Sequence, residues 1–371
     1  MIYFDNAASG FFKPSKAIDA AIETMKALSV NSGRSAHRLA VEAERKVFYA
    51  RKFLSKTFNN GAIERVIFTS NCTEALNTAI FGMPLRYGEI VTSVTEHNSV
   101  LRPLYHLQDG GVEIKFAKFS DKPFIQAKDL LPLVTKKTDM VVLNAVSNVT
   151  GYKNEFREIG ARLKELGIPL VVDGAQAGGH ISIDMKRDNV DCLCLAGHKG
   201  LYSVQGVGVL IFNEKTSVSP LKYGGSGTES FLKAPTMYPE MLEAGTLNLP
   251  AIVSLHEGAK YAYERVETTA RTLTLLTEKL INGLSCSDEI EIYSEKNPFG
   301  IVSFAHKKYD SISLSRFLSD RYDIAVRGGF HCAPKIHEAL FTENCGLIRA
   351  SLSPFNDESE INEFLKIILS L

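Results

Sequence analysis

Short apolar runs recur along the first 212 residues, and segments with helical spacing separate most of them. The seven runs are VIFTS (66–70), EIVTSV (89–94), EIKFAKF (113–119), MVVLNAV (140–146), PLVVDGA (169–175), CLCLAG (192–197) and GVGVLIF (206–212). Runs of about four to eight residues rich in Val, Ile and Leu are typical of buried strands. Residues 36–57, 73–83 and 155–167 carry apolar side chains at helical intervals. The alternation predicts an α/β fold with a large, mostly parallel, seven-stranded sheet wrapped by helices.

The pattern changes near residue 250. A long helical stretch over 251–283 is followed by the strand-like runs IEIYS, IVSFAH, IAVRGG and LIRASLS, with helices between them. This pattern predicts a smaller α+β lobe at the C-terminus. A chain of 371 residues also exceeds one typical domain. We therefore predict a large domain over residues 14–250 and a small domain formed by residues 1–13 and 251–371.

Composition excludes several classes of protein. Lys+Arg and Asp+Glu both number 42, so we expect neither a nucleic-acid partner nor a membrane surface. We see no signal peptide and no apolar run long enough to span a bilayer. Six cysteines are too few for a disulfide framework and lack zinc-ligand spacing, so we predict no metal site. A cytoplasmic location is expected.

Polar residues gather where the predicted strands end, which is where parallel sheets bind ligands. They are Thr69–Thr73, Glu96–His97, Asn148, Asp173–Gln176 and Gly197–Lys199. Thr73 opens a helix whose N–H groups suit a phosphate, or the segment is an ordinary N-cap with Glu74 in the first turn. Asp173 suits a protonated pyridine nitrogen, or caps a helix. Lys199 suits attack on an aldehyde, or is a surface lysine.

In chain order, these three groups match the needs of pyridoxal 5'-phosphate (PLP), whose ring acts as an electron sink. The motifs YFDNAASG, SNCTEALN, TEHNSV, SNVTGY, VDGAQA, AGHKG, EAGTLN, RGGFHCA and IRASLSPFN follow one another along the chain. In this order they resemble the cysteine desulfurase / selenocysteine lyase family of class V, fold type I PLP enzymes. VDGAQ followed by GHK is highly specific for this group of families, and RGGFHCA narrows the resemblance further. The resemblance covers essentially the whole chain and implies the fold of a PLP-dependent transferase.

The resemblance implies roles for individual residues. Lys199 bonds covalently to the cofactor, Asp173 binds the pyridine nitrogen, and His97 stacks on the ring. The complete cofactor-binding set is Cys72, Thr73, His97, Asn148, Asp173, Gln176, His198, Lys199, Gly245 and Thr246. Gln176 and Asn148 reach the phenolic oxygen, whereas Thr73, the Cys72 backbone and His198 hold the phosphate. Gly245 and Thr246 resemble a segment that reaches the phosphate across a dimer interface, which implies a homodimer.

Substrate binding follows from the same resemblance. Arg349 resembles the arginine that clamps the substrate carboxylate, and Ala8 and Asn148 complete the substrate side. One residue departs from the family pattern, because Ala196 stands where a serine commonly contributes a hydroxyl to the phosphate. This difference predicts weaker cofactor retention.

Cys332 decides the chemistry. It follows His331 in RGGFHCAPK and lies close to Arg327, so local positive charge favours a thiolate. The resemblance makes it the nucleophile that takes sulfur from the substrate as a persulfide, with Lys199, Cys332 and His97 as the catalytic set. Its surroundings resemble the short-loop group II enzymes, which implies a sulfur-accepting partner protein. The other cysteines stand in helix- or strand-like contexts, and we expect them to be structural: Cys72, Cys192, Cys194, Cys286 and Cys345.

The predicted function is conversion of L-cysteine to L-alanine, or cleavage of L-selenocysteine. Two alternatives stay open at this stage. One is another class V enzyme, an aminotransferase or a β-lyase, in which Cys332 is incidental. The other is an inactive PLP-binding scaffold, for which Ala196 is the one supporting residue and the intact Lys199 and Asp173 speak against it.

Overall fold

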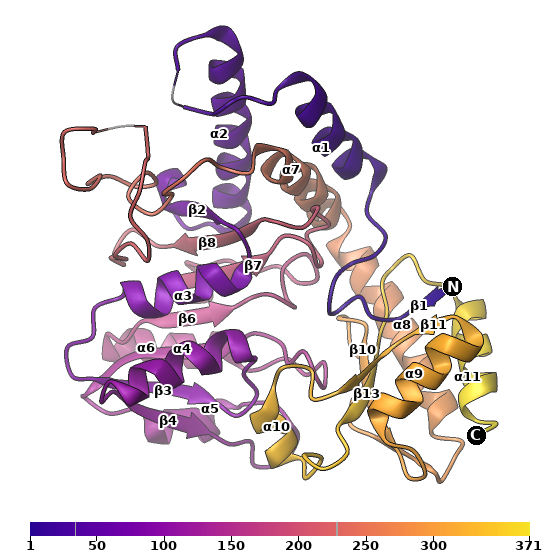
Figure 1. Cartoon of the computed structure of the whole chain (residues 1–371). Helices are drawn as coiled ribbons and strands as arrows, with labels where there is room; N and C mark the ends of the chain where they lie inside the picture. The colour runs from indigo at the N-terminus through magenta and orange to yellow at the C-terminus, as the bar shows by residue number, and fades with distance from the viewer. Residues whose placement is uncertain (34, 228) are drawn as a thin grey trace.

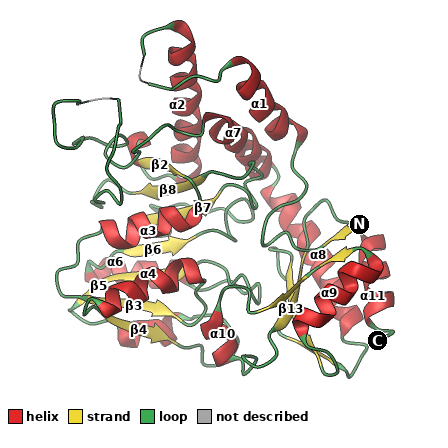
Figure 2. Cartoon of the chain, viewed as in Figure 1, coloured by secondary structure: helices red, strands yellow, loops and turns green. Residues whose placement is uncertain are grey.

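A computed structural model describes residues 1–33, 35–227 and 229–371. Its largest element is a seven-stranded sheet with the order β2-β8-β7-β6-β5-β3-β4 (Figures 1 and 2). Five neighbouring strands, from β7 to β4, run parallel, whereas β8 is antiparallel to both β7 and β2. The strands are β2 (Val66–Thr69), β3 (Glu89–Ser93), β4 (Glu113–Ala117), β5 (Thr138–Asn144), β6 (Leu170–Asp173), β7 (Cys192–Ala196) and β8 (Gly208–Phe212). The predicted mostly parallel sheet is confirmed.

Helices cover both faces of this sheet, because its strands are apolar on both sides. On one face α3 (Cys72–Gly82) and α4 (Asn98–Asp109) form a core with strand residues such as Ile90 and Val142. On the other face α2 (Arg38–Phe58), α6 (Phe156–Leu166) and α7 (Leu249–Glu264) pack with their neighbours Val91 and Val141. The remaining helices of this lobe are α1 (Ser15–Ala27), η1 (Ile63–Arg65), α5 (Ala127–Leu130) and η2 (Leu131–Leu133).

The smaller lobe is built on a four-stranded antiparallel sheet with the order β12-β13-β10-β9. Its elements are α8 (Val266–Leu284), β9 (Ile290–Ile292), β10 (Ile301–His306), α9 (Ser311–Tyr322), β11 (Ile324–Ala325), β12 (Arg327–Gly329), α10 (Pro334–Ala339), β13 (Leu347–Ser351) and α11 (Glu358–Ile368). The N-terminal strand β1 (Ile2–Tyr3) pairs in parallel with β11, and Phe4 is buried in the core of this lobe. The chain therefore begins beside its C-terminal lobe (Figure 1).

The helical stretch predicted over 251–283 is two helices, α7 and α8, which meet at Arg265. The Arg265 guanidinium lies 4.2 Å from the centre of the Tyr261 ring. Ala251 and Leu255 of α7 belong to the core of the large lobe, whereas Leu273 and Leu280 of α8 belong to the core of the small lobe. We therefore propose that the domain boundary lies between α7 and α8, one helix later than residue 250.

A buried ion pair fixes the loop that leads to α7. The two terminal nitrogens of Arg51, a residue of α2, donate to the two Glu243 carboxylate oxygens at 2.8 and 2.9 Å. Glu243 Oε1 also accepts the Phe68 N–H of β2 at 2.7 Å. The loop is thereby held against α2 and β2. None of the helices within the described part of the chain is long and apolar enough to cross a membrane.

The start of α3 approaches β8 so closely that only glycine fits at position 208. A Cβ at Gly208 would lie 2.2 Å from the Asn71 carbonyl carbon and 2.7 Å from the Cys72 nitrogen, both backbone atoms.

We expect Gly208→Ala to lower the free energy of unfolding by about 1–3 kcal/mol, because strand and helix must separate. Gly224→Ala is the control, since its Cβ would meet Ala244 at an ordinary 3.5 Å. Urea unfolding measures both, and equal losses would contradict the steric argument.

Candidate active site

A cavity of about 220 Å³ lies at the carboxyl ends of β5, β6 and β7. It collects most of the site residues predicted from the sequence. They are Ala8, Cys72, Thr73, His97, Asn148, Asp173, Gln176, His198, Lys199 and Arg349. Ala196, Arg327 and His331 also line it. The carboxyl ends of parallel strands therefore bring together residues from separate parts of the chain, as the strand pattern predicts.

Lys199 and Asp173 form the chemical centre of the cavity. Asp173 is the last residue of β6 and is buried, and its Oδ1 accepts the Ala175 N–H at 2.9 Å. Burial raises the pKa of Asp173, while the Lys199 charge acts in the opposite direction. Burial lowers the pKa of Lys199; the Asp173 charge opposes this shift, and the charges of Arg349 and Arg327 add to it. The arrangement favours a neutral Lys199 amine, which is the form that attacks a carbonyl carbon.

The first turn of α3 offers unpaired N–H groups to the cavity. The N-cap is Asn71, whose side chain accepts the Glu74 N–H at 2.9 Å. Within the described residues, no acceptor contacts the N–H groups of Cys72 or Thr73. The segment is thus both a capped helix start and a seat for an anion, because the N-cap leaves these two donors free.

His198 lies two residues after the end of β7 and lines the same cavity. Its Nδ1 is 3.1 Å from the Ser9 hydroxyl, which also lies 3.5 Å from Gln205 Nε2. Burial lowers the pKa of His198 to about 4, with the Lys199 charge as a second cause. The ring is therefore neutral at neutral pH. The methyl group of Ala196 lines the cavity nearby and supplies no hydroxyl.

His97 caps α4 and also lines the cavity. Its Nδ1 accepts the Ser99 N–H at 3.1 Å and lies 2.8 Å from the Ser99 hydroxyl. An Nδ1 that accepts from a backbone N–H carries no proton, which leaves the ring proton on Nε2. Burial lowers the pKa of His97 to about 4, and the charges of Lys199 and several arginines add to this shift. A neutral ring suits contact with a flat aromatic group.

Glu96, which precedes His97, is fully buried beneath the site. Its Oε1 accepts the Ser93 hydroxyl at 2.6 Å and the Asn144 N–H at 3.1 Å. Its Oε2 has no partner within the described chain. Burial raises the pKa of Glu96 to about 8. The carboxyl group is therefore protonated at neutral pH and holds the turn before α4 without adding a charge.

The amide nitrogens of Gln176 and Asn148 contact backbone carbonyls. Gln176 Nε2 donates to Ala7 O at 2.9 Å, and Asn148 Nδ2 donates to His331 O at 2.8 Å. Asn148 Oδ1 is buried and lacks a partner among the residues that the structure describes. The two side chains therefore tie the N-terminal segment and the Cys332 loop to the cavity wall. Their contact with a phenolic oxygen stays a prediction.

Arg349 lies in the interface between the lobes with its side chain 1% exposed. One terminal nitrogen donates to Asp5 Oδ1 and the other to Asn148 O, both at 2.9 Å. Its Nε is buried and has no partner in the described parts of the chain. Sequence reasoning missed Asp5, although YFDNAASG contains it. A chemical argument could have identified Asp5, because a buried arginine needs a counter-charge.

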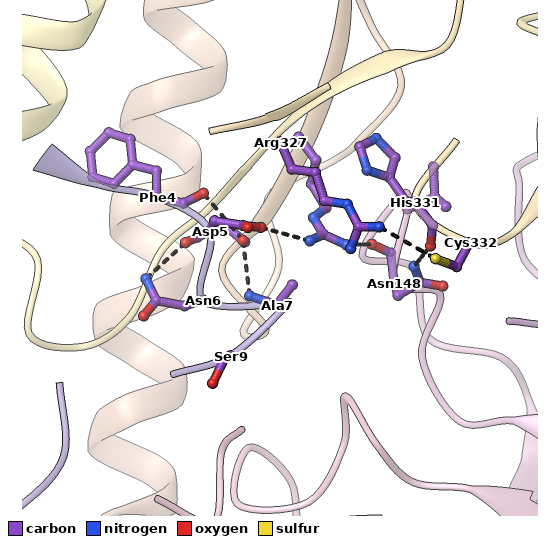
Figure 3. Close-up of polar contacts among 12 residues, drawn as sticks. Phe4, Asp5, Asn6, Ala7, Ser9, Asn148, Arg327, His331 and Cys332 are labelled. Atoms are coloured by element: carbon purple, nitrogen blue, oxygen red, sulfur yellow. Dashed lines mark hydrogen bonds and ion pairs between the residues drawn. The ribbon is translucent and has the colours of Figure 1, made fainter. Parts of the chain in front are cut away.

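The Cys332 loop connects β12 to α10. His331 and Cys332 both adopt left-handed backbone conformations, with φ of 50° and 57°. The Asn98 N–H donates to Cys332 O at 2.7 Å, and Arg327 Nη2 lies 3.3 Å from Cys332 Sγ (Figure 3). The loop is therefore short and tied to the start of α4. Sequence reasoning missed the Asn98 contact.

The cysteines divide by exposure. Cys72, Cys192 and Cys194 are buried, whereas Cys332 is exposed. Cys286 and Cys345 are exposed as well. Cys286 lies two residues after α8, and Cys345 lies two residues before β13.

Gly245 and Thr246 do not line this cavity. Thr246 Oγ1 lies 3.5 Å from Asn31 Nδ2, and Gly245 lines a separate cavity of about 480 Å³ beside Arg51. Within one chain the structure therefore keeps this segment apart from Lys199.

Known proteins share both the fold and the sequence. The family model "Aminotransferase class-V" matches residues 2–364. A probable cysteine desulfurase of Pyrococcus abyssi is 32% identical, with 100% of this chain and 94% of the relative covered. One of Methanothermobacter thermautotrophicus is 30% identical over 97% and 92%. The apo cysteine desulfurase structure from Thermococcus onnurineus NA1 superimposes with a TM-score of 0.91 at 29% identity, covering 100% of this chain and 94% of that one.

The sheet topology, with a lysine and an aspartate at its carboxyl edge, defines a PLP-dependent enzyme of fold type I. The chain belongs to the class-V aminotransferase family and, within it, to the cysteine desulfurases. The cavity fits PLP on its own residues. It offers unpaired N–H groups at α3 for a phosphate, a buried carboxylate for a ring nitrogen and an amine of lowered pKa for an aldehyde.

The buried Glu96 predicts a pH effect on stability. Between its ordinary pKa of 4.5 and about 8, the folded protein keeps a proton that the unfolded chain has released. The contribution of this group to stability therefore falls as pH rises through that window. In Glu96→Gln, a neutral isostere, we expect the slope to lessen by up to about 1.4 kcal/mol per pH unit. Denaturant unfolding from pH 5 to 8 measures the slope. Glu363→Gln, which removes an exposed carboxylate, is the control. The same dependence of stability on pH in the unaltered protein and in both variants would refute a protonated Glu96.

Proposed function

We propose that this chain converts L-cysteine to L-alanine and holds the released sulfur as a persulfide on Cys332. One observation carries the proposal. Lys199 and Asp173 line one cavity. A backbone hydrogen bond from Asn98 N–H to Cys332 O joins the Cys332 loop to the start of α4, the helix that His97 caps. The cavity supplies the groups that a PLP enzyme needs, and the exposed thiol beside it supplies a sulfur acceptor.

PLP in this cavity would be held by Lys199 at its aldehyde, by Asp173 at its ring nitrogen and by the free N–H groups of Cys72 and Thr73 at its phosphate. When bound, PLP takes up the electron pair released at the substrate carbon. The unprotonated Nδ1 of His97 points to its own helix, so this ring offers the cofactor a neutral face. His198 lies beside the N-terminal Ser9 and is neutral, so it would bind the phosphate through a hydrogen bond without adding a full charge.

Arg349 is the carboxylate-binding residue of this proposal. Its buried Nε has no partner among residues 1–33, 35–227 and 229–371 and can donate to a substrate carboxylate. Asp5 and Asn148 O hold the two terminal nitrogens, so the guanidinium is fixed before substrate arrives. Lys199 has a pKa lowered by burial, so its amine can accept a proton from the substrate carbon and return it.

Sulfur transfer to Cys332 balances without another reactant. The Cys332 thiolate attacks the substrate sulfur, the carbon–sulfur bond breaks, and the carbon takes a proton to leave as alanine. The new sulfur–sulfur bond leaves a persulfide on Cys332. Arg327, which lines the Lys199 cavity, contacts Cys332 Sγ at 3.3 Å and so links the thiol to that cavity. Because the loop is short and tied, an acceptor must come to the persulfide, and a sulfur-accepting partner is part of this proposal.

We also propose a homodimer in a reducing compartment such as the cytoplasm. Thr246 lies outside the cavity of its own chain, beside Asn31. A second copy that presents Thr246 to the α3 seat would complete the phosphate site. The loop that carries Thr246 is rigidly anchored through the Arg51–Glu243 ion pair, as such a contact requires.

The central test of the function is Cys332→Ala. We expect it to abolish sulfide release from L-cysteine, because no soft nucleophile remains for the sulfur, while the absorbance of bound PLP and its response to cysteine persist. Cys345→Ala removes another exposed thiol and is the matched control. Selenium leaves more readily than sulfur, so the Cys332→Ala protein keeps part of any selenocysteine lyase activity. Full cysteine activity in Cys332→Ala would make the thiol a bystander and the protein a β-lyase.

Mixed dimers test the shared site. Thr246→Glu places a negative charge against the phosphate and should strip PLP from a Thr246→Glu homodimer. A dimer of one Lys199→Ala chain and one Thr246→Glu chain should regain one complete site, with about half of the wild-type activity, if Thr246 serves its neighbour. If Thr246 serves its own chain, the mixed dimer has no complete site. Thr246→Ser keeps the hydroxyl and is the control, and purification with two different tags isolates the mixed dimer.

A further inference from the structure

Cys332 opens onto a second cavity, outside the one that holds Lys199. This outer chamber has a volume of about 540 Å³ and lies against α3 and α4. Cys332 lines the outer chamber but not the inner cavity, whereas Thr73, His97 and Ser99 line both. The Cys332 side chain is therefore accessible from the outer chamber.

The outer chamber is positive on the side that the helices form. Arg102 of α4 lines it and is exposed, and His106 lies one turn further along the same helix. Arg327 contributes a second positive charge through its contact with Cys332 Sγ. None of the described residues that line the chamber is Asp or Glu. The Arg102 charge also contributes to the lowered pKa of His97, which places that charge close to the shared wall.

The acidic residues of α3 and α4 are Glu74 and Asp109. Glu74 of α3 accepts the Ser70 N–H at 2.6 Å and pairs with Lys222 at 2.6 Å. Asp109 lies at the C-terminal end of α4, after His106. Neither residue lines the chamber. The positive charge of Arg102 is therefore available to a ligand.

We propose that the outer chamber binds a small thiol that carries a carboxylate, and that Arg102 binds this carboxylate while the thiol attacks the Cys332 persulfide. The acceptor thiolate forms a bond to the outer sulfur of the persulfide. The sulfur–sulfur bond to Cys332 breaks, and Cys332 leaves as a thiolate. The product is the persulfide of the acceptor, so no oxidant or reductant is consumed. This inference rests on the proposed persulfide of Cys332.

Two observations favour a small acceptor. The chamber volume lies in the range of small-molecule sites, about 300–1,000 Å³. The Cys332 loop is held by the Asn98 N–H at Cys332 O and by Asn148 Nδ2 at His331 O. A loop tied at two successive carbonyls keeps the persulfide within the chamber, so the acceptor thiol has to enter it.

The test separates binding of the acceptor from formation of the persulfide. The PLP-loaded protein is given stoichiometric L-cysteine, and intact mass shows one additional sulfur atom on Cys332. Discharge is then timed after addition of 3-mercaptopropionate or of its methyl ester, which carries the same thiol without the charge. We expect Arg102→Gln to slow discharge by 3-mercaptopropionate about fivefold and to change discharge by the ester less than about twofold.

Two controls bracket the result. Arg102→Lys keeps the charge and should retain most of the preference for the anion. Lys164→Gln removes an exposed charge from α6, on the other face of the sheet, and should change neither rate. Rising salt should slow the anionic thiol alone in the unaltered protein, which checks the effect without any substitution. Equal slowing of both thiols by Arg102→Gln, or of neither, would overturn the inference. Absence of the extra sulfur before any thiol is added would instead overturn the proposed function.

Discussion

Arg349 carries a positive charge into the interface between the two lobes, where water cannot solvate it. A guanidinium in that position must be compensated by protein groups, and Asp5 and Asn148 O supply the contacts. Arg349 belongs to β13 of the small lobe, Asp5 to the N-terminal segment and Asn148 to the loop after β5. One buried charge therefore holds three separate parts of the chain in register. The Cys332 loop depends on it too, because Asn148 also holds the carbonyl of His331.

Burial, more than any single charge, sets the protonation states of the site. It is the largest cause of the lowered pKa of Lys199, of His97 and of His198. It is also the largest cause of the raised pKa of Asp173 and of Glu96. The Lys199 charge also lowers the pKa of both histidines, and three arginines add to this shift at His97. A cavity of this kind keeps its bases neutral and available, which is what proton transfer near neutral pH requires.

Two neighbouring cavities separate Lys199 and Asp173 from Cys332. The inner one encloses the amine and the carboxylate at the strand ends, whereas the Cys332 side chain lines the outer one. The backbone at His331 and Cys332 is left-handed at both residues, an arrangement that costs energy and persists because flanking contacts hold it. Those contacts come from the large lobe, at Asn98 and Asn148. The position of the thiol is therefore set across the lobe interface.

The sequence alone determined the elements and the edge of the sheet where the site lies. The runs that end at Asp173 and at Ala196 became neighbouring buried strands, so Asp173 and Lys199 meet in one cavity as expected. Periodicity reports burial of neighbouring residues, and that information is local. Contacts between distant residues leave no such periodic trace. Asp5 and Arg349 are 344 positions apart, and only the tertiary structure revealed their ion pair. The same holds for the separate cores in which α7 and α8 pack and for the cavity that Cys332 lines, because both depend on which surfaces pack together once the chain has folded.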